Sequence, residues 1–155
     1  MLKRPIFLLL LSGTVSAAEP WDDLDAQISQ ALPGVIELRH AIHQQPELGN
    51  RELHTSERIA QRLRELGLEV QTGIAHTGVI GILRGGKPGP VVAIRAELDA
   101  LPLTEQTGLP FASTVRSKDE GADFRSRGKD VGVMHACGHD AHMAMALGVA
   151  EVLAA

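Results

Sequence analysis

The amino-acid sequence predicts an α/β fold, in which helices cover a central sheet, over a single globular unit. Two observations support this prediction. Apolar residues recur at helical intervals in several parts of the chain, and between these parts lie short apolar runs bounded by glycine and proline, as is typical of strands. The composition, 44% hydrophobic and 22% charged over 155 residues, is that of an ordinary globular domain.

Helical periodicity dominates the first part of the chain. Residues 22–45 carry apolar side chains at helical intervals, and Pro33-Gly34 is expected to divide them into two helices. Pro46 is expected to end the second helix, because the residue before a proline is pushed away from helical angles. The next helix is predicted over residues 53–66, and the glycine that follows is placed to cap its carboxyl end.

Strand signals follow in the middle of the chain. Residues 68–72 and 78–83 are predicted to form short strands. Residues 90–98 include a nearly continuous apolar run, as expected of a strand that is buried on both faces. Residues 104–130 are polar and rich in glycine, which predicts a long surface loop before a last strand at residues 131–134.

An apolar helix is predicted from Ala141 to the last residue. It stops at Ala155 without a capping glycine or a polar end. We therefore expect the chain to be a fragment or the product of a truncated open reading frame.

The first 17 residues have the pattern of a secretory signal peptide. Lys3 and Arg4 precede the apolar run of residues 6–11, and small residues follow that run. The apolar run is shorter than the roughly 20 residues needed to cross a bilayer, which argues against a membrane anchor. We expect residues 1–17 to be removed and residues 18–155 to be secreted or periplasmic.

The composition also excludes one class of partner. The formal net charge is −4 and no basic stripe is present, whereas duplex binding depends on Lys and Arg that neutralise phosphates. Aromatic residues make up 3% of the chain and Tyr is absent, so there is no stacking platform for single strands. A small-molecule substrate is favoured over nucleic acid.

The single cysteine, Cys137, has no intramolecular partner for a disulfide. Metal ligation, nucleophilic chemistry or burial as a small apolar residue would each explain it. Cys137 and His139 are two residues apart, so they can meet one ion only in a turn, and Gly138 supplies the necessary freedom. Thiolate plus imidazole favours an ion such as zinc, and two ligands alone cannot hold a structural zinc.

Further candidate ligands and bases surround this turn. His135, Asp140 and His142 lie within the same eight residues, where they could support a ligand or contact the substrate, and His142 could also be a ligand itself. Glu97 and Asp99 lie on the same side at the carboxyl edge of the strand predicted at residues 90–98. There they could bind a metal, orient a ligating histidine, act as a base or simply solvate the strand end. The competing hypothesis is a cysteine hydrolase, in which Cys137 is the nucleophile and His139 or His142 the base.

Four motifs in this order carry a resemblance to a known family. They are residues 38–48 (LRHAIHQQPEL), 76–79 (HTGV), 95–102 (RAELDALP) and 134–142 (MHACGHDAH). Together they resemble the M20 peptidase family. The closest branch is its amidohydrolases, which cleave hippurate, indole-acetyl-amino acids and other N-acyl amino acids.

The resemblance implies a zinc-peptidase-like catalytic domain with a central parallel-rich sheet flanked by helices. It implies that Cys137 and His139 are metal ligands and that Asp99 orients a ligand. Many relatives have Asp where this chain has Glu97. One or two divalent ions, zinc or manganese, would support hydrolysis of an amide bond in an N-acyl amino acid or a peptide-like substrate.

The resemblance also implies parts that this sequence does not contain. Relatives supply a paired Glu motif and two further His ligands beyond this point, together with an inserted dimerisation domain that makes full-length relatives homo-oligomers. The chain is therefore an enzyme by family, and the alternative is an inactive fragment that binds a metal weakly.

Overall fold

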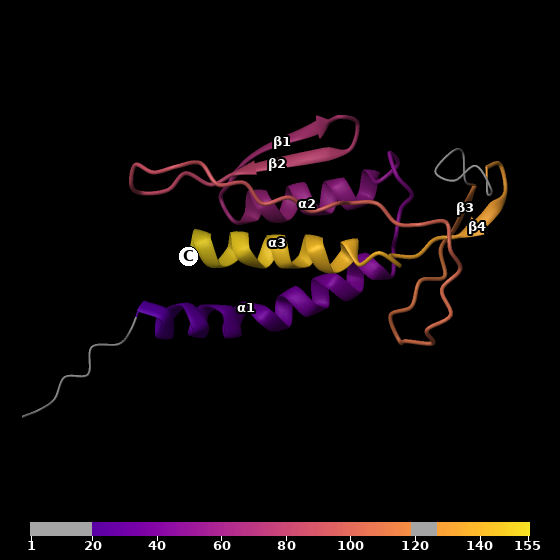
Figure 1. Cartoon of the computed structure of the whole chain (residues 1–155), viewed down its shortest axis with the longest axis horizontal. Coiled ribbons are helices and arrows are strands. Elements are labelled where there is room, and N and C mark those ends of the chain that lie inside the picture. Colours follow the sequence, from indigo (N-terminus) through magenta and orange to yellow (C-terminus); the bar gives the residue numbers. More distant parts are fainter. Residues whose placement is uncertain (1–19, 119–126) are drawn as a thin grey trace, which may run out of the picture.

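The computed structural model of this chain describes residues 20–118 and 127–155, which contain three helices and two pairs of short strands (Figure 1). The predicted signal peptide, residues 1–17, lies outside the described residues and stays a prediction. No helix in the described ranges is long and apolar enough to span a bilayer. The elements are α1 (Pro20–His43), α2 (Leu53–Glu65), β1 (Glu69–Ile74), β2 (Gly78–Ile82), β3 (Arg116–Lys118), β4 (Asp130–Gly132) and α3 (His139–Ala154).

The first helix, α1, is continuous through Pro33, so the predicted division at Pro33-Gly34 is wrong. Proline has no N–H, so Pro33 leaves the backbone carbonyl of Ser29, four residues earlier, without its helical hydrogen bond and strains the helix. Both Pro33 and Ser29 are exposed. Water can therefore satisfy the freed carbonyl, while packing of α1 against α3 stabilises the helix. The helix ends at His43, before Pro46 as predicted.

The second helix, α2, confirms the helix predicted at residues 53–66 and its glycine cap. Gly67 has φ of 81°, and its N–H donates to the Arg64 carbonyl at 2.9 Å. The Leu68 N–H donates to the Leu63 carbonyl at 3.1 Å. These two bonds form a Schellman motif, which satisfies carbonyls that the helix end leaves without partners.

Two carboxylates hold the loop between α1 and α2. Glu47 accepts hydrogen bonds from the backbone N–H groups of His54 and Thr55, the second and third residues of α2. Glu52 is buried and accepts from the Asn50 N–H at 3.0 Å and from Thr77 Oγ1 at 2.7 Å. Glu47 therefore holds the start of α2 against the loop that follows α1, and Glu52 joins that loop to Thr77 in the β1–β2 turn.

Strands β1 and β2 form an antiparallel hairpin, which confirms the strands predicted at residues 68–72 and 78–83. The turn between them uses positive φ at Ala75 and His76. The hairpin packs on α2, and Figure 1 shows the hairpin, α2, α3 and α1 side by side in that order.

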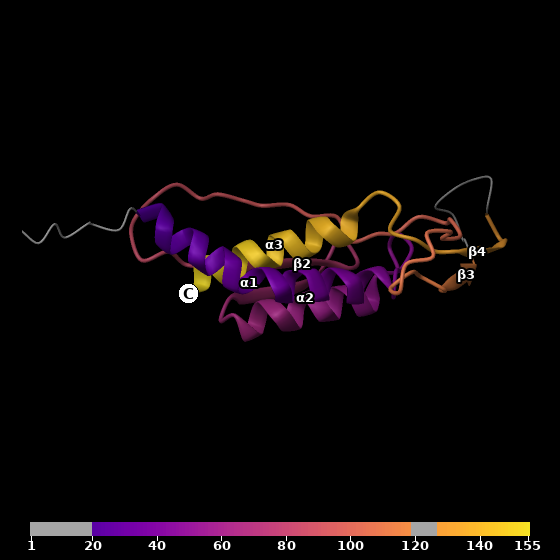
Figure 2. The ribbon, with the colours of Figure 1, turned by 90° about the horizontal axis from the view of Figure 1, so that it is seen from below.

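The segment at residues 90–98 is the main departure from the predicted fold. It is extended, but it pairs with no strand, and the side chains of Val91 and Val92 are 97% and 81% exposed. In Figure 2 the connection from β2 passes along α3, outside the layer of helices. A strand exists only when a neighbour accepts and donates its backbone hydrogen bonds, and the described residues supply none here.

The α/β class is confirmed, but the described residues do not build a central parallel-rich sheet. Both strand pairs are antiparallel, and the parallel contact is one isolated bridge between Leu48 and Ala100. The predicted loop at residues 104–130 contains β3, which pairs with β4. The last predicted strand is shorter than expected, since Met134 forms only an isolated bridge with Leu101.

Two clusters of buried side chains fix the start of α3. The larger lies among the three helices and consists of Ile42, Ile59, Leu63, Met143 and Leu147. The smaller lies beneath the chain that leads into α3 and consists of Leu48, Ala100 and Val133. The first turn of α3 therefore packs against buried side chains, and such packing keeps the geometry of a site fixed.

Candidate metal centre

The residues before α3 form the turn that the spacing of Cys137 and His139 requires. The Ala136 N–H donates to the Met134 carbonyl at 2.9 Å. Gly138 has φ of 84°, a left-handed conformation that favours glycine, and α3 begins at the next residue. Cys137 therefore lies in the turn, and His139 opens the helix.

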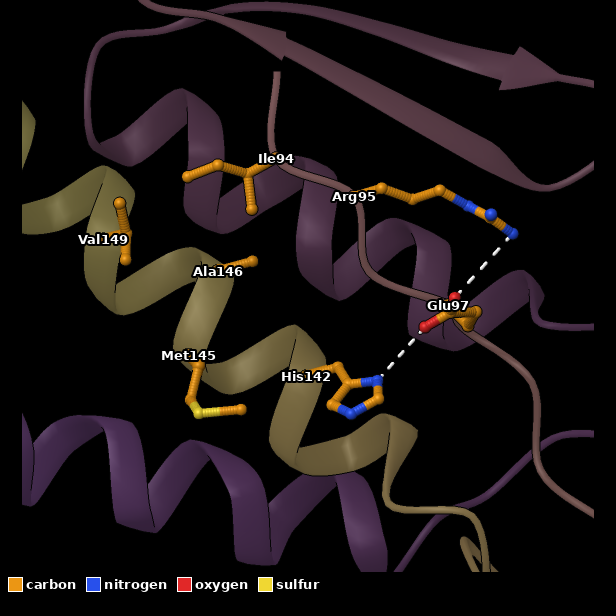
Figure 3. Close-up of a pocket in the computed structure, with 7 residues that line it drawn as sticks. All are labelled: Ile94, Arg95, Glu97, His142, Met145, Ala146 and Val149. Atoms are coloured by element: carbon orange, nitrogen blue, oxygen red, sulfur yellow. Dashed lines mark hydrogen bonds and ion pairs between the residues drawn. The ribbon is translucent and has the colours of Figure 1, made fainter. Parts of the chain in front are cut away.

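Three side chains converge at this helix start. Nitrogen or oxygen atoms of Glu97, His139 and His142 all lie within 4.8 Å of one another, and we call these three residues the metal cluster. His142 Nδ1 lies 3.1 Å from Glu97 Oε2, as Figure 3 shows. Zinc holds nitrogen and oxygen ligands at about 2.0–2.2 Å, so only small side-chain movements would bring the three onto one ion.

The Glu97 carboxylate is kept ionised by its neighbours. The hydrogen bond from His142 is the main reason that the pKa of Glu97 is lowered. Arg95 adds to this effect, with Nη2 3.8 Å from Glu97 Oε1. An ionised carboxylate is the form that binds a cation, so the charge state suits a ligand.

Asp99 holds the ring of His139. His139 Nδ1 lies 2.9 Å from the Asp99 backbone carbonyl and 3.1 Å from its Oδ1. When Nδ1 donates its hydrogen to these oxygens, Nε2 is left as the nitrogen that can bind a metal. This geometry fits the orienting role that the resemblance implies for Asp99, although the role itself stays a prediction.

Comparison with known proteins places this cluster in a family. Residues 93–155, which include the whole metal cluster, match the model of peptidase family M20/M25/M40. Thermostable carboxypeptidase 1 of Saccharolobus solfataricus is 47% identical over 120 residues, covering 77% of this chain and 27% of that protein. The chain belongs to the M20 peptidase family.

One further relative and one solved structure agree with this assignment. Hippurate hydrolase of Campylobacter jejuni is 44% identical over 124 residues, covering 79% of this chain and 28% of that protein. The crystal structure of the YXEP protein of Bacillus subtilis, described as a dinuclear metal-binding peptidase of the M20 family, superposes with a TM-score of 0.65 at 39% identity. It covers 84% of this chain and 31% of that one. The M20 chain thus spans under a third of each of these relatives.

Cys137 is exposed in the M20 chain and is not a member of the metal cluster. The turn carries its thiol outside the group that Glu97, His139 and His142 form. Metal ligation by Cys137 therefore stays a prediction from the sequence.

His135 and Asp140 point into the protein. His135 is 4% exposed, and neither ring nitrogen has a hydrogen-bond partner among the described residues. Burial lowers the pKa of His135 to about 4, so its ring is neutral near pH 7. Burial alone would raise the pKa of Asp140, but hydrogen bonds from His43 and Arg39 outweigh it and lower the pKa. Neither residue is part of the metal cluster.

Sequence reasoning missed a group of hydrogen-bonded polar side chains behind the metal cluster of this M20 chain. Arg39 Nε and His43 Nδ1 both contact Asp140 Oδ2, at 2.9 and 2.8 Å. His43 Nε2 also lies 3.1 Å from Oε1 of Glu105, whose side chain is fully buried. The four-residue spacing of Arg39 and His43 on one face of α1 was the available signal.

A hollow adjoins the metal cluster between the extended segment and α3. Figure 3 shows Glu97 and His142 at one end of it and apolar side chains at the other. Its lining residues are Ile94, Arg95, Glu97, His142, Met145, Ala146 and Val149. The cluster is therefore open to molecules that enter along α3.

Proposed function

We propose that this chain is the amino-terminal part of the catalytic domain of a metal-dependent amidohydrolase. The substrates would be N-acyl amino acids or peptide-like amides. The observation that supports this function best is the convergence of Glu97, His139 and His142, with Asp99 holding His139. The activity of the whole protein belongs to the proposal, because the chain spans under a third of the relatives described above.

The named relatives support this substrate class. A carboxypeptidase hydrolyses the amide before a carboxyl-terminal amino acid, and hippurate is a glycine acylated on nitrogen. Both substrates have an amide bond next to an amino acid carboxylate. We carry that shared feature to the present protein and leave the acyl group open.

The residues fit a divalent ion of borderline softness. Two imidazoles and one carboxylate are donors that both zinc and manganese accept, and the three side chains come from two chain segments that meet only in the fold. A cation held there would act as a Lewis acid on the carbonyl of an amide substrate. Asp99 would keep His139 in the required orientation and tautomer, and Glu97 would supply negative charge.

Titration with cobalt or zinc tests the metal centre on this chain. His139 is common to the metal cluster and to the Cys137-His139 pair, so His139→Ala should abolish binding. Glu97→Gln should weaken binding if the cluster holds the ion. A sulfur-to-cobalt charge-transfer band that disappears in Cys137→Ser would instead add the thiol to the ligands. The absence of stoichiometric binding by the wild-type chain would refute the centre.

Hydrolysis by the full-length protein that contains this sequence tests the activity. Release of free amino acid from hippurate or an N-acetyl amino acid should stop in a strong chelator and return with zinc or manganese. Activity that survives the chelator but is lost to a thiol alkylator would favour Cys137 as a nucleophile.

We also propose that the protein is exported. The support is the amino-terminal pattern of Lys3, Arg4 and the apolar run at residues 6–11. Expression in a bacterium, followed by fractionation and mass determination, should find a periplasmic chain that begins near Ala18. A cytoplasmic chain that retains Met1 to Ala17 would refute export.

A further inference from the structure

His43 is a buried histidine with a carboxylate on each side. Its Nδ1 lies 2.8 Å from Asp140 Oδ2 and its Nε2 lies 3.1 Å from Glu105 Oε1. All three side chains are 5% exposed or less. Glu105 is itself held, since Oε2 accepts a hydrogen bond from the Ser113 N–H at 2.6 Å. A histidine that faces two carboxylates donates to both only when each ring nitrogen carries a hydrogen.

This row of contacts joins three separate parts of the chain at the start of α3. His43 is the last residue of α1, Glu105 belongs to the loop after the extended segment, and Asp140 is the second residue of α3. Arg39, on the same face of α1, adds a second bond to Asp140 Oδ2 at 2.9 Å. The Asp140 carboxylate is thus held by two side chains of α1, which is the kind of hydrogen bonding that a buried carboxylate needs.

The side chain of Asp140 projects from α3 in a different direction from those of the two histidines of the metal cluster. Successive residues of a helix are rotated by about 100°, so His139 and His142, three residues apart, lie on nearly the same face. Asp140 lies on another side, where it contacts α1, while the histidines face Glu97 and Asp99. Any rotation of the first turn about the helix axis would therefore move both histidines.

We propose that His43 is a positioning residue of the metal centre: by holding Asp140, it fixes the rotation of the first turn of α3 and so aims His139 and His142. This inference rests on the proposed function. It goes beyond that function because His43 touches neither the cluster nor Asp99, and it acts through the Asp140 carboxylate. The bond to Glu105 serves to hold the His43 ring in place.

The two ring nitrogens can be tested separately. In His43→Asn the side-chain amide can take the place of Nδ1 and keep the bond to Asp140, whereas in His43→Gln it can take the place of Nε2 and keep the bond to Glu105. Both variants lose one buried hydrogen bond, and both replace the imidazole ring with an amide. A purely structural role predicts similar losses in the two variants. A positioning role through Asp140 predicts that only the Asn variant recovers metal binding.

Zinc affinity of the full chain is the first measurement, alongside thermal unfolding of the metal-free protein. Loss of a residue that supports a ligand costs roughly tenfold to a hundredfold in metal affinity. We expect that loss in His43→Gln, with most of it recovered in His43→Asn, while the two melting temperatures fall by similar amounts. Equal affinities in the two variants would overturn the proposal.

The second measurement does not need a metal. Nitrogen-15 NMR of the metal-free chain reports which ring nitrogen of His139 carries hydrogen, and the contact with Asp99 favours Nδ1. His43→Gln should mix the two tautomers, and His43→Asn should preserve the wild-type one. Should the wild-type chain bind no zinc, the proposed function fails, but the tautomer still decides whether His43 aims His139. An unchanged tautomer in both variants would refute positioning.

Arg62→Gln is the matched control, because Arg62 Nη2 ties α2 to Glu151 near the far end of α3 at 2.8 Å. It should leave both the zinc affinity and the His139 tautomer unchanged. If neither His43 variant folds, Arg39→Gln removes the other donor to Asp140 Oδ2 from a side chain that is 39% exposed. A reduced zinc affinity in this variant supports the proposal, and a wild-type affinity overturns it.

Discussion

Glu47 closes the amino-terminal end of α2 by accepting a hydrogen bond from the Thr55 N–H at 2.8 Å with its Oε2. Its other carboxylate oxygen accepts from the His54 N–H at 3.2 Å and lies 2.9 Å from His54 Nδ1. The residue at the helix boundary, Glu52, makes no side-chain cap of its own. A carboxylate from the preceding loop therefore does the work of an N-cap, and its charge suits the positive end of the helix.

The first prediction concerns Glu47 and pH. Burial would raise the pKa of Glu47, but the hydrogen bonds from Thr55 and His54 outweigh burial and lower it below 4.5. The stabilisation by ionised Glu47 is therefore complete above pH 4.5 and is lost as the pH falls through the lower, folded-state pKa. Glu47→Gln should lower the free energy of unfolding by about 1 kcal/mol at pH 7. Urea unfolding should find that this difference shrinks at pH 3; a constant difference would contradict the prediction.

The second prediction concerns Asp99 and the metal. Asp99→Asn removes the negative charge beside His139 Nδ1 but leaves the backbone carbonyl contact. We expect zinc to bind about tenfold more weakly, because the carboxylate raises the basicity of the ligating ring. Calorimetric titration measures this. Asp130→Asn, which removes an exposed partner of Arg116, is the control and should bind zinc as the wild type does.

The third prediction concerns the glycine that ends α2. Gly67→Ala should lower the free energy of unfolding by about 1–2 kcal/mol, because an L-residue at φ of 81° is strained. No atom lies within 4 Å of the added methyl, so strain is the whole effect. Urea unfolding measures it. Gly86→Ala also adds a methyl in open space, but without a positive φ, and should change stability little. Equal effects in the two variants would count against the argument.

The fourth prediction concerns the packing of α3. Met143 is 1% exposed and lies in the larger buried cluster, whereas Met145 on the same helix is 55% exposed. Met143→Ala should cost about 2–5 kcal/mol through lost burial and the cavity that remains. Met145→Ala should cost much less, since its side chain is already largely in water. Chemical denaturation measures the free energy of unfolding of both variants. A loss of stability in Met145→Ala as large as that in Met143→Ala would contradict the described packing of α3.

Structural features that depend on neighbouring residues could be predicted from the sequence. The helix at residues 53–66, its glycine cap and the two short strands that follow depend on periodicity and on backbone freedom within a few residues, and the structure confirms all three. The turn at Gly138 was likewise predicted from the backbone freedom of glycine. Glu97 and Asp99 each meet a different histidine of α3, and the roles that the sequence suggested for them stay predictions.

Only the tertiary structure decided the contacts between distant parts of the chain. His43 meets Asp140 across 97 positions and Glu105 across 62, and no local pattern on α1 states which carboxylates it will face. The apolar run at residues 90–98 predicted a strand, yet it has no pairing partner in the described part of the chain, because a strand requires a hydrogen-bonding neighbour as well as its own propensity. Helices and tight turns satisfy their backbone groups internally, whereas strands and buried charges need partners that the fold must bring to them.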